Sequence, residues 1–401
     1  MDIRYVDSAP RKLASFDPQV DFEPDDIAHL AELFHTPLDG SYNWDYRVAD
    51  NRIKRLYELG KELNWNASTA IDWGQNPDYG DQPPLAPDAA DELIEGYPWT
   101  GYRPFDELST RDKLKFIRHD FTWSLSQFLH GEQGALLVAS QLASCAPSFN
   151  AKLYAASQTF DEARHVEVFN RYLQTKIGFA YPVTQGLKDL LDKILTDQRW
   201  DLKFIGMQII LEGLALAAFH VARNDTDDPV LDELLYLVIR DEARHVTFGV
   251  NYLEEFIATL SDEEREARAE FAYQACIVSR DRLISNDVFR YFGWDVEDAR
   301  GALIERGLNA DFLNMLYARI IPNLKRIGLL TDRVRPKFEE MGVLDFENLA
   351  TDGDIDWRAL ERPLDVLACE GQSPSRSPAE GSLACEGQSP SRSPAEGSVN
   401  R

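Results

Sequence analysis

A six-residue sequence, Asp-Glu-Ala-Arg-His-Val, occurs twice in this chain, at 161–166 and at 241–246. The two copies are 80 residues apart, and a glutamate lies 30 residues before the glutamate of each copy: Glu132 in the first case and Glu212 in the second. Because the same residue types return in register, we interpret the repeat as a duplicated pair of helices. Each pair then contributes the same set of polar side chains to one structure.

The hydrophobic pattern around these motifs predicts long helices. From Ser109 onward, apolar residues recur every three or four positions with few helix breakers. A further helix is expected to begin at Ser261, because Ser261-Asp-Glu-Glu264 has the form of a capping box. The four long helices are expected at 110–144, 147–177, 198–223 and 229–260. The predicted fold class is all-α: a four-helix bundle core with additional helices, to about residue 342, and an extended N-terminal segment.

Composition divides the chain into three parts. Residues 1–105 are rich in Asp, Pro, Gly and Trp, and we expect an N-terminal extension packed on the core, with a short helix at 49–63. Residues 106–345 are the predicted helical domain, and 346–401 a C-terminal tail. From Leu367 the sequence LACEGQSPSRSPAEGS occurs twice in succession. This segment is expected to be disordered, because it has too few apolar residues to offset the entropy lost on folding.

Charge and targeting signals narrow the functional classes. The net charge of -26 disfavours binding to nucleic acid or to an anionic membrane surface. The four cysteines lack the paired spacing of a zinc site, and the N-terminus lacks the apolar stretch of a secretory signal, so a cytoplasmic protein is expected. The apolar segment 205–222 contains Gln208, Glu212 and His220. We therefore predict a buried helix there rather than a membrane span.

The repeated residues have the spacing of metal ligands. A glutamate and a histidine three residues apart lie on one face of a helix, so each copy can bind a metal ion. One glutamate from each of the other two helices completes six ligands for two metals, as in di-iron and di-manganese carboxylate bundles. Oxygen-rich ligation with one imidazole per metal suits iron or manganese better than zinc. The predicted ligands are Glu132, Glu162, His165, Glu212, Glu242 and His245.

The residues beside the ligands also repeat. Asp161 and Asp241 are predicted to accept a hydrogen bond from the outer nitrogen of a ligand histidine, that of the opposite copy, which would fix its tautomer. Arg164 and Arg244 would then balance the charge of these aspartates. The alternative interpretation is that all four residues form surface ion pairs.

The two motifs and their upstream glutamates resemble the ferritin-like di-iron carboxylate superfamily, over about residues 110–260. In layout, His130-Gly-Glu-Gln-Gly-Ala135 and Asp161-Glu-Ala-Arg-His165 are most similar to the oxygenase alpha subunits of bacterial multicomponent monooxygenases and related di-iron oxygenases. The resemblance implies a ferritin-like bundle that binds two iron ions, with a Mn/Fe pair as the alternative. The same six residues are then the ligands.

Three departures from related patterns restrict the expected reaction. Ribonucleotide reductase small subunits usually have a tyrosine where this chain has Phe169, and commonly an aspartate in place of Glu132. Arylamine N-oxygenases have a further histidine on the last metal-binding helix, but 229–244 contains none. A typical multicomponent hydroxylase has a threonine at the position of Leu216. A radical-generating role is disfavoured, and proton delivery is expected to differ from that of the usual hydroxylase.

The expected activity is oxidation of a small organic substrate by dioxygen, through hydroxylation or N-oxygenation. A di-iron oxidase or desaturase on the same site is one alternative, and a ferritin-like protein that stores or senses iron is another. Electrons are expected from an external reductase or ferredoxin, because no flavin or iron–sulfur motif is visible; a homodimer is a further expectation. The substrate pocket is predicted between the first and third helices, at Gly131, Ala135, Ala215 and Leu216. Small residues on helices can equally serve close helix packing.

Overall fold

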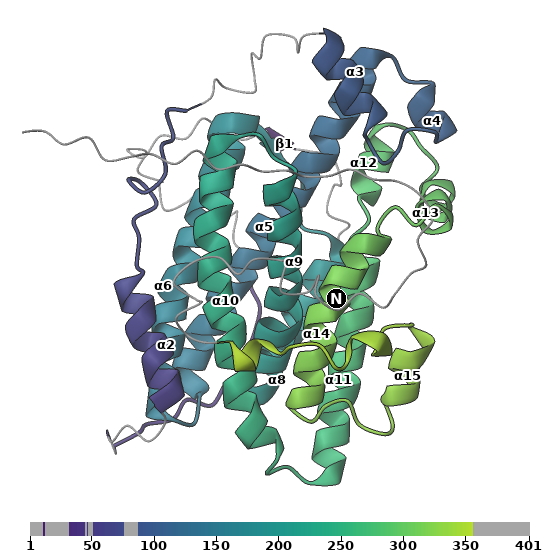
Figure 1. Cartoon of the computed structure of the whole chain (residues 1–401). Helices are drawn as coiled ribbons and strands as arrows, with labels where there is room; N and C mark the ends of the chain where they lie inside the picture. The colour runs from purple at the N-terminus through teal and green to yellow at the C-terminus, as the bar shows by residue number, and fades with distance from the viewer. Residues whose placement is uncertain (1–10, 13–31, 45, 47–50, 76–86, 356–401) are drawn as a thin grey trace, which may run out of the picture.

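The computed structural model describes residues 11–12, 32–44, 46, 51–75 and 87–355. Most of these residues are helical and very few are in strands, which confirms the all-α fold class (Figure 1). The two short strands, β1 (Arg11–Lys12) and β2 (Phe179–Ala180), pair in antiparallel fashion. The tail that was expected to be disordered lies outside the described residues, and the division of the chain near residues 105 and 345 remains a prediction.

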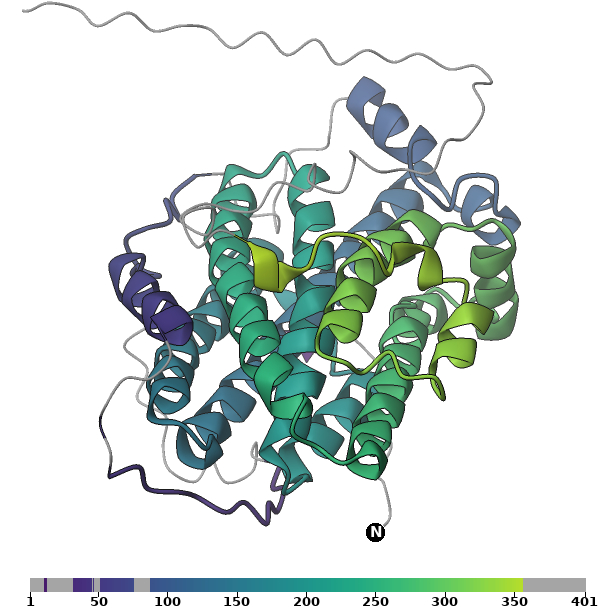
Figure 2. The same cartoon turned by 60° about the horizontal axis from the view of Figure 1, so that its bottom comes forward.

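Four long helices form the core of the molecule and run side by side in both views (Figures 1 and 2). The first is α5 (Thr110–Cys145), and the second is α6 (Phe149–Tyr172), which continues into the π-helical segment η2 (Leu173–Ile177). The third helix consists of three consecutive elements, α8 (Trp200–Phe204), η3 (Ile205–Leu211) and α9 (Glu212–Asn224). The fourth is α10 (Pro229–Ile257). Helix α5 packs along α6, and α10 packs along α9.

Local sequence signals set the ends of these helices. The side chains of Ser109 and Ser148 cap α5 and α6, since each accepts a hydrogen bond from a backbone N–H in the first turn. Asp228 caps α10, and Pro229 occupies its first turn. Gly178 follows η2 with a φ of 87°, a left-handed conformation that favours glycine. The predicted ranges of the four helices therefore agree closely with the structure.

The third helix contains a feature that the sequence pattern did not indicate. Its middle segment, η3, is π-helical and ends directly before Glu212. Gly249 of α10 lies against this segment: a Cβ atom at Gly249 would lie 2.4 Å from Cβ of Gln208. By length and composition, Trp200–Asn224 could cross a membrane, but 89% of its apolar window is buried inside the protein. The prediction of a buried helix at 205–222 agrees with this finding.

Additional helices cover the bundle on several sides. Helix α2 (Asn51–Glu62) packs against α6 and α10, and α7 (Gln185–Thr196), which was not predicted, packs along α5. Helices α11 (Asp262–Asp281) and α14 (Ala310–Arg326) pack against η3 and α9 (Figure 2). The predicted capping box is present at the start of α11. The shorter elements are α3 (Pro87–Glu95), α4 (Arg103–Asp106), α12 (Asn286–Tyr291), α13 (Val296–Glu305), α15 (Arg335–Glu340), η4 (Leu344–Phe346) and η5 (Asp352–Asp354).

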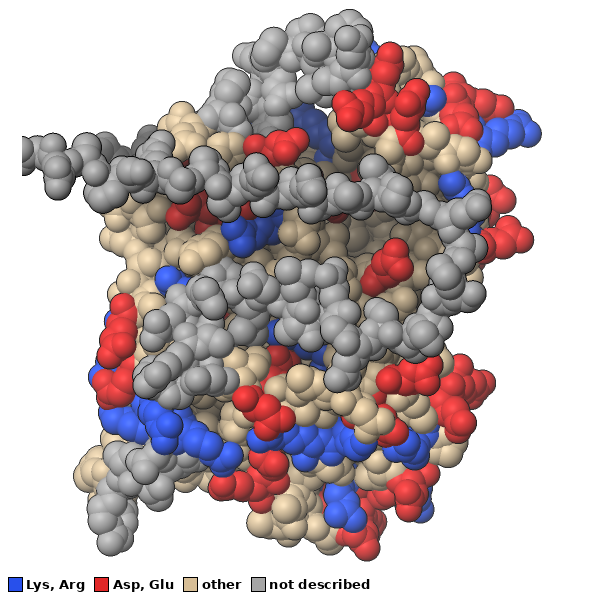
Figure 3. Space-filling model, viewed as in Figure 1, with Lys and Arg blue, Asp and Glu red and all other residues tan. Residues whose placement is uncertain are grey.

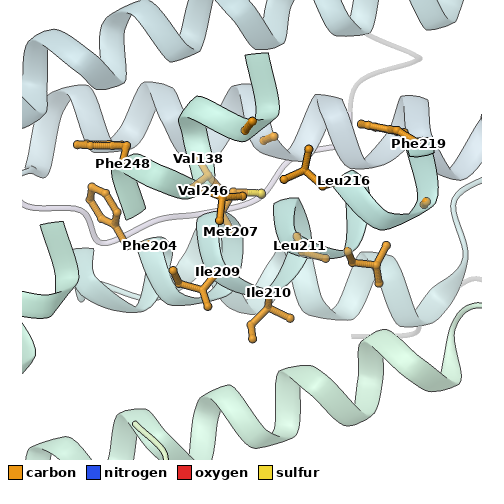
Figure 4. Close-up of a cluster of buried hydrophobic side chains, with 14 of the residues drawn as sticks. Val138, Phe204, Met207, Ile209, Ile210, Leu211, Leu216, Phe219, Val246 and Phe248 are labelled. Carbon is orange, nitrogen blue, oxygen red and sulfur yellow. The ribbon is translucent and has the colours of Figure 1, made fainter. Parts of the chain in front are cut away.

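The main hydrophobic core runs through the bundle. Figure 4 shows one part of it, in which Met207 of η3 lies close to Val138 of α5 and Val246 of α10, and Phe204 of α8 lies close to Phe248 of α10. A second, aromatic cluster lies where α3, α4, α12 and α13 meet the N-terminal half of α5. On the face drawn in Figure 3, acidic and basic side chains are interleaved rather than separated into patches.

Candidate metal centre

The structure brings all six predicted ligands together in the middle of the bundle. Helices α5 and α9 contribute one glutamate each, and α6 and α10 contribute a glutamate and a histidine each. None of the six residues is more than 4% exposed. Their ligand atoms form two groups, in each of which the atoms lie within 4.8 Å of one another: Glu132, Glu162, His165 and Glu242 form the first, and Glu162, Glu212, Glu242 and His245 the second.

Two glutamates connect the groups. One oxygen of Glu162 lies 3.2 Å from Nδ1 of His165, and the other lies 3.1 Å from Nδ1 of His245. The oxygens of Glu242 are placed in the same way, 3.0 Å from His165 and 3.4 Å from His245. Glu132 contacts only the first histidine, at 3.2 Å. Glu162 and Glu242 thus belong to both groups, and the six side chains could hold two metal ions.

Hydrogen bonding alone does not account for this cluster. Nδ1 of His165 has carboxylate oxygens of Glu132, Glu162 and Glu242 within 3.2 Å, but an imidazole nitrogen carries at most one proton. A cation with ligand distances of about 2.0–2.2 Å would satisfy all of these atoms at once. In addition, Oε2 of Glu212 is buried without a hydrogen-bond partner in the described part of the chain. The residues present therefore fit a metal pair.

The charges lead to the same conclusion. The outer aspartates and arginines cancel, so among the described residues the two histidines are the only cationic groups within the cluster that can balance its four buried glutamates. Burial raises the pKa of Glu132 and of Glu212 well above the usual range. Burial also acts to raise the pKa of Glu162, but the nearby His245 and His165 have the larger effect and hold the pKa of the Glu162 carboxyl far below its usual value. Two divalent cations would neutralise all four glutamates in their ionised form.

The outer nitrogens of the histidines face aspartates of the opposite motif. Nε2 of His245 lies 3.2 Å from Asp161, and Nε2 of His165 lies 3.4 Å from Asp241. Each aspartate can therefore accept the outer N–H and leave Nδ1 free as a metal ligand. Although burial opposes ionisation, the nearby Arg244 and His165 hold the pKa of Asp241 well below its usual range.

The arginines of the two motifs complete a crossed network. Arg164 donates to the Asp161 carboxylate and, at 3.2 Å, to Asp241. Arg244 donates to Asp241 at 2.7 Å and to Asp161 at 3.3 Å. All four side chains are at most 5% exposed, so they do not form surface ion pairs.

Two polar residues of the centre were not identified from the sequence. The indole N–H of Trp65 donates a buried hydrogen bond of 2.7 Å to Asp241, which is 176 residues away in the chain. The side-chain amide of Gln158 donates to Glu212 at 2.7 Å and to Glu162 at 3.1 Å. Gln158 precedes Glu162 by one helical turn, so its position was a usable signal. No sequence pattern connects Trp65 to the repeat.

A cavity of about 320 Å³ opens beside the cluster. Glu132, Glu212 and Glu242 form part of its wall, and most of the remaining lining is apolar. The lining residues from α5 are Phe121, Trp123, Ser124, Gln127, Phe128, Gly131 and Ala135. Those from the third helix are Met207, Leu211, Leu214, Ala215, Ala218, Phe219, Val221 and Ala222, and Asp225 lines the cavity just after this helix ends. The cavity therefore lies where the pocket was predicted, between the first and third helices.

Leu216 is a correction to the predicted pocket. Gly131, Ala135 and Ala215 line the cavity, but Leu216 does not; it is fully buried in the hydrophobic core (Figure 4). Successive residues of a helix point about 100° apart, so Leu216 points away from the side that Ala215 presents to the cavity. The apolar wall of α9 consists instead of residues such as Leu214 and Ala218.

The glycines near the ligands divide between the two roles considered for small residues. A Cβ atom at Gly131 would meet nothing within 4 Å, so this residue leaves space in the cavity. A Cβ at Gly134 would lie 2.3 Å from the Leu191 side chain of α7, and one at Gly213 would lie 3.4 Å from Ile320 of α14. Gly134 therefore serves close helix packing, whereas a Cβ at Gly213 would make an ordinary van der Waals contact.

Comparisons with known proteins give matches in structure only. No protein-family profile matches the sequence, and no curated protein matches it. Among solved structures, a mutant R2-like ligand-binding oxidase with an anaerobically reconstituted Mn/Fe cofactor is 18% identical; the match covers 70% of this chain and 94% of that one, with a TM-score of 0.45. A dimanganese(II) NrdF from Streptococcus sanguinis is 15% identical, with 72% and 92% covered and a TM-score of 0.43.

Proposed function

We propose that this protein binds two metal ions, Fe/Fe or Mn/Fe, and uses dioxygen to oxidise a largely apolar organic molecule. One observation carries the proposal: three of the clustered glutamates, Glu132, Glu212 and Glu242, also form part of the wall of the apolar cavity. A substrate in the cavity would thus lie next to the metal pair. A protein that stores or senses iron does not require such a cavity.

The chain itself performs four tasks in this proposal. The six side chains would hold the metal pair, and Glu162 and Glu242, each of which contacts both histidines, would keep the two ions close together. Asp161 and Asp241 hold the histidine tautomer in which Nδ1 is unprotonated. The apolar cavity lining excludes water from the reacting centre. When bound, a redox-active metal pair supplies the electron transfer that dioxygen chemistry needs.

Further features of the proposal concern partners. An external reductase or ferredoxin would return the electrons that each turnover consumes. We propose hydroxylation or N-oxygenation as the reaction and keep oxidation without oxygen insertion as the alternative on the same site. The cytoplasmic location and the homodimer remain predictions.

Reconstitution tests the proposed function directly. The full chain is loaded anaerobically with ferrous iron, bound metal is measured by elemental analysis, and dioxygen uptake is followed after mixing with air-saturated buffer. We expect two metals per chain and dioxygen consumption that depends on them. The double variant His165→Ala, His245→Ala serves as the control and should lose both. Fewer than two metals in the wild-type chain, or uptake that is equal in the control, would exclude the proposal.

A further inference from the structure

The cavity contains a positive charge that the metal centre does not use. Apart from the cluster glutamates, Arg282 and Asp225 are the charged side chains among the described residues that line it. Arg282 directly follows α11 and therefore belongs to the layer outside the four-helix bundle. Leu283, Asn309 and Phe312 line the cavity from the same layer.

Arg282 is half-buried, and it differs from the buried arginines in having no partner. Arg164, Arg244 and Arg268 each form an ion pair with a buried aspartate. The Arg282 side chain makes no hydrogen bond or ion pair with any residue in the described part of the chain. Its Nε atom is buried and unsatisfied, as it is in Arg164 and Arg244, but Arg282 lacks the carboxylate partner that those two arginines have. An arginine in this position costs free energy unless a ligand supplies the missing acceptor.

The position of Arg282 is fixed by packing. A Cβ atom on Gly186, at the start of α7, would lie only 3.0 Å from Cβ of Arg282, so the glycine allows the two segments to approach. Burial lowers the pKa of the Arg282 guanidinium to about 10, which leaves it charged at neutral pH. The second charged residue, Asp225, is exposed and can remain hydrated. Arg282 is thus the group that gains most from a ligand.

We infer that Arg282 binds a carboxylate on the substrate, whose apolar part fills the cavity beside the metal centre. The planar guanidinium can donate two parallel hydrogen bonds to a carboxylate, which gives orientation as well as affinity. The substrate class is therefore an apolar organic acid, and Arg282 is a specificity-determining residue. The inference rests on the proposed function in taking this cavity as the substrate site, but the binding itself requires no turnover.

A binding experiment with two matched probes tests the inference. n-Octanoate and n-octanol share an apolar chain and differ in the charge at one end. Their Kd values are measured by calorimetry on the full chain, both metal-free and metal-loaded, for the wild type, Arg282→Gln and Arg282→Lys. Arg103→Gln is the control, because Arg103 is highly exposed and pairs with Glu107 on the surface. Thermal melting of each variant checks that it is folded.

We expect octanoate to bind the wild type and Arg103→Gln at least about tenfold more tightly than octanol, a difference of about 1.4 kcal/mol, because the guanidinium donates charge-assisted hydrogen bonds to the carboxylate alone. Arg282→Gln should remove this preference and leave octanol binding unchanged, and Arg282→Lys should retain part of it. Equal binding of both probes by the wild type, or no binding of either, would overturn the inference. So would octanoate binding that persists in Arg282→Gln when metal is present, because the metals would then hold the carboxylate. Metal content and dioxygen uptake are measured separately, so failure of the proposed function is distinguishable.

Discussion

Glu162 and Glu242 differ from the other ligands because each presents one oxygen to each histidine. Glu132, by contrast, belongs to only one of the two ligand groups. Removing Glu132 should therefore impair one metal position, whereas removing a bridging carboxylate should impair both. We expect about one metal per chain in Glu132→Ala and close to none in Glu242→Ala, by elemental analysis after equal loading and desalting. Equal metal content in the two variants would contradict the bridged arrangement.

The protonation of the metal-free ligands leads to a second prediction. Burial raises the pKa of Glu132 and of Glu212, and the surrounding carboxylates raise the pKa of His165 and of His245 despite burial. At neutral pH these groups hold protons that a metal must displace, so metal affinity should fall as the pH is lowered. Calorimetric titration at pH 7 in two buffers of different ionisation enthalpy should show net proton release. A binding enthalpy independent of the buffer would refute this.

Trp65 provides a test of the network outside the ligands. Its indole N–H donates to the buried carboxylate of Asp241, whereas the indole of Trp73 donates to the backbone carbonyl of Ala67. A hydrogen bond to a charged group contributes about 1.5–3 kcal/mol and one between neutral groups about 0.5–1.5 kcal/mol. Trp65→Phe should therefore lower the free energy of unfolding more than Trp73→Phe, in urea titrations of the metal-free protein. Equal losses of unfolding free energy in the two variants would mean that the hydrogen bond to Asp241 stabilises the protein no more than the bond to the Ala67 carbonyl.

For single residues, the sequence predicted the positions that recur in both motifs. It did not predict contacts between segments that are far apart in the chain. The clustering of Glu132, Glu162, His165, Glu212, Glu242 and His245 was predictable because a two-metal site needs the same residue types twice, in register. The pairing of Asp161 with His245 followed from the same symmetry. The contact between Trp65 and Asp241 has no counterpart in the repeat, because it depends on how the segment after α2 crosses the bundle.

Among the elements, helices with clear caps and long apolar stripes were predictable, and local deviations were not. Helix α7 was missed although Leu187, Leu190, Leu191 and Ile194 have helical spacing and are buried. The π-helical segment η3 has no such signal, because a π-helical turn depends on the packing of neighbouring helices. The error at Leu216 has a similar origin: the sequence places residues on a helix but does not say which side faces the cavity.

Two glycines of α5 test how closely the elements pack. Gly134→Ala would bring a methyl group within 2.3 Å of Leu191 and push α7 away from α5. Gly131→Ala would meet nothing within 4 Å and should gain up to about 1 kcal/mol in helix propensity. We expect Gly134→Ala to lower the free energy of unfolding by about 1–3 kcal/mol. Thermal and urea unfolding of both variants measure the difference, and a stable Gly134→Ala protein would show that α7 is not held closely.

In the whole molecule, the cavity depends on three layers at once. The bundle supplies the carboxylates, and apolar residues of α5, η3 and α9 supply the walls. The segment that follows α11 and the start of α14 close the outer side. The bundle was visible in the sequence through its repeat. The outer wall was not, because Arg282, Leu283, Asn309 and Phe312 lie just after α11 or at the start of α14, in segments that carry no part of the repeat.

The cavity and the metal centre should therefore be separable by mutation. Ala135 is 4% exposed and lines the cavity one turn from Glu132, and its own side chain is no ligand. Ala135→Phe should fill the space and weaken binding of n-octanoate by tenfold or more, on the order of 1.4 kcal/mol, while two metals remain bound. Ala135→Ser, which adds one small atom, is the matched control and should behave like the wild type. If Ala135→Phe lost its metals, the two sites would be structurally inseparable. If it bound octanoate normally, the ligand would lie elsewhere, and the assignment of this cavity as the substrate site would have to be withdrawn.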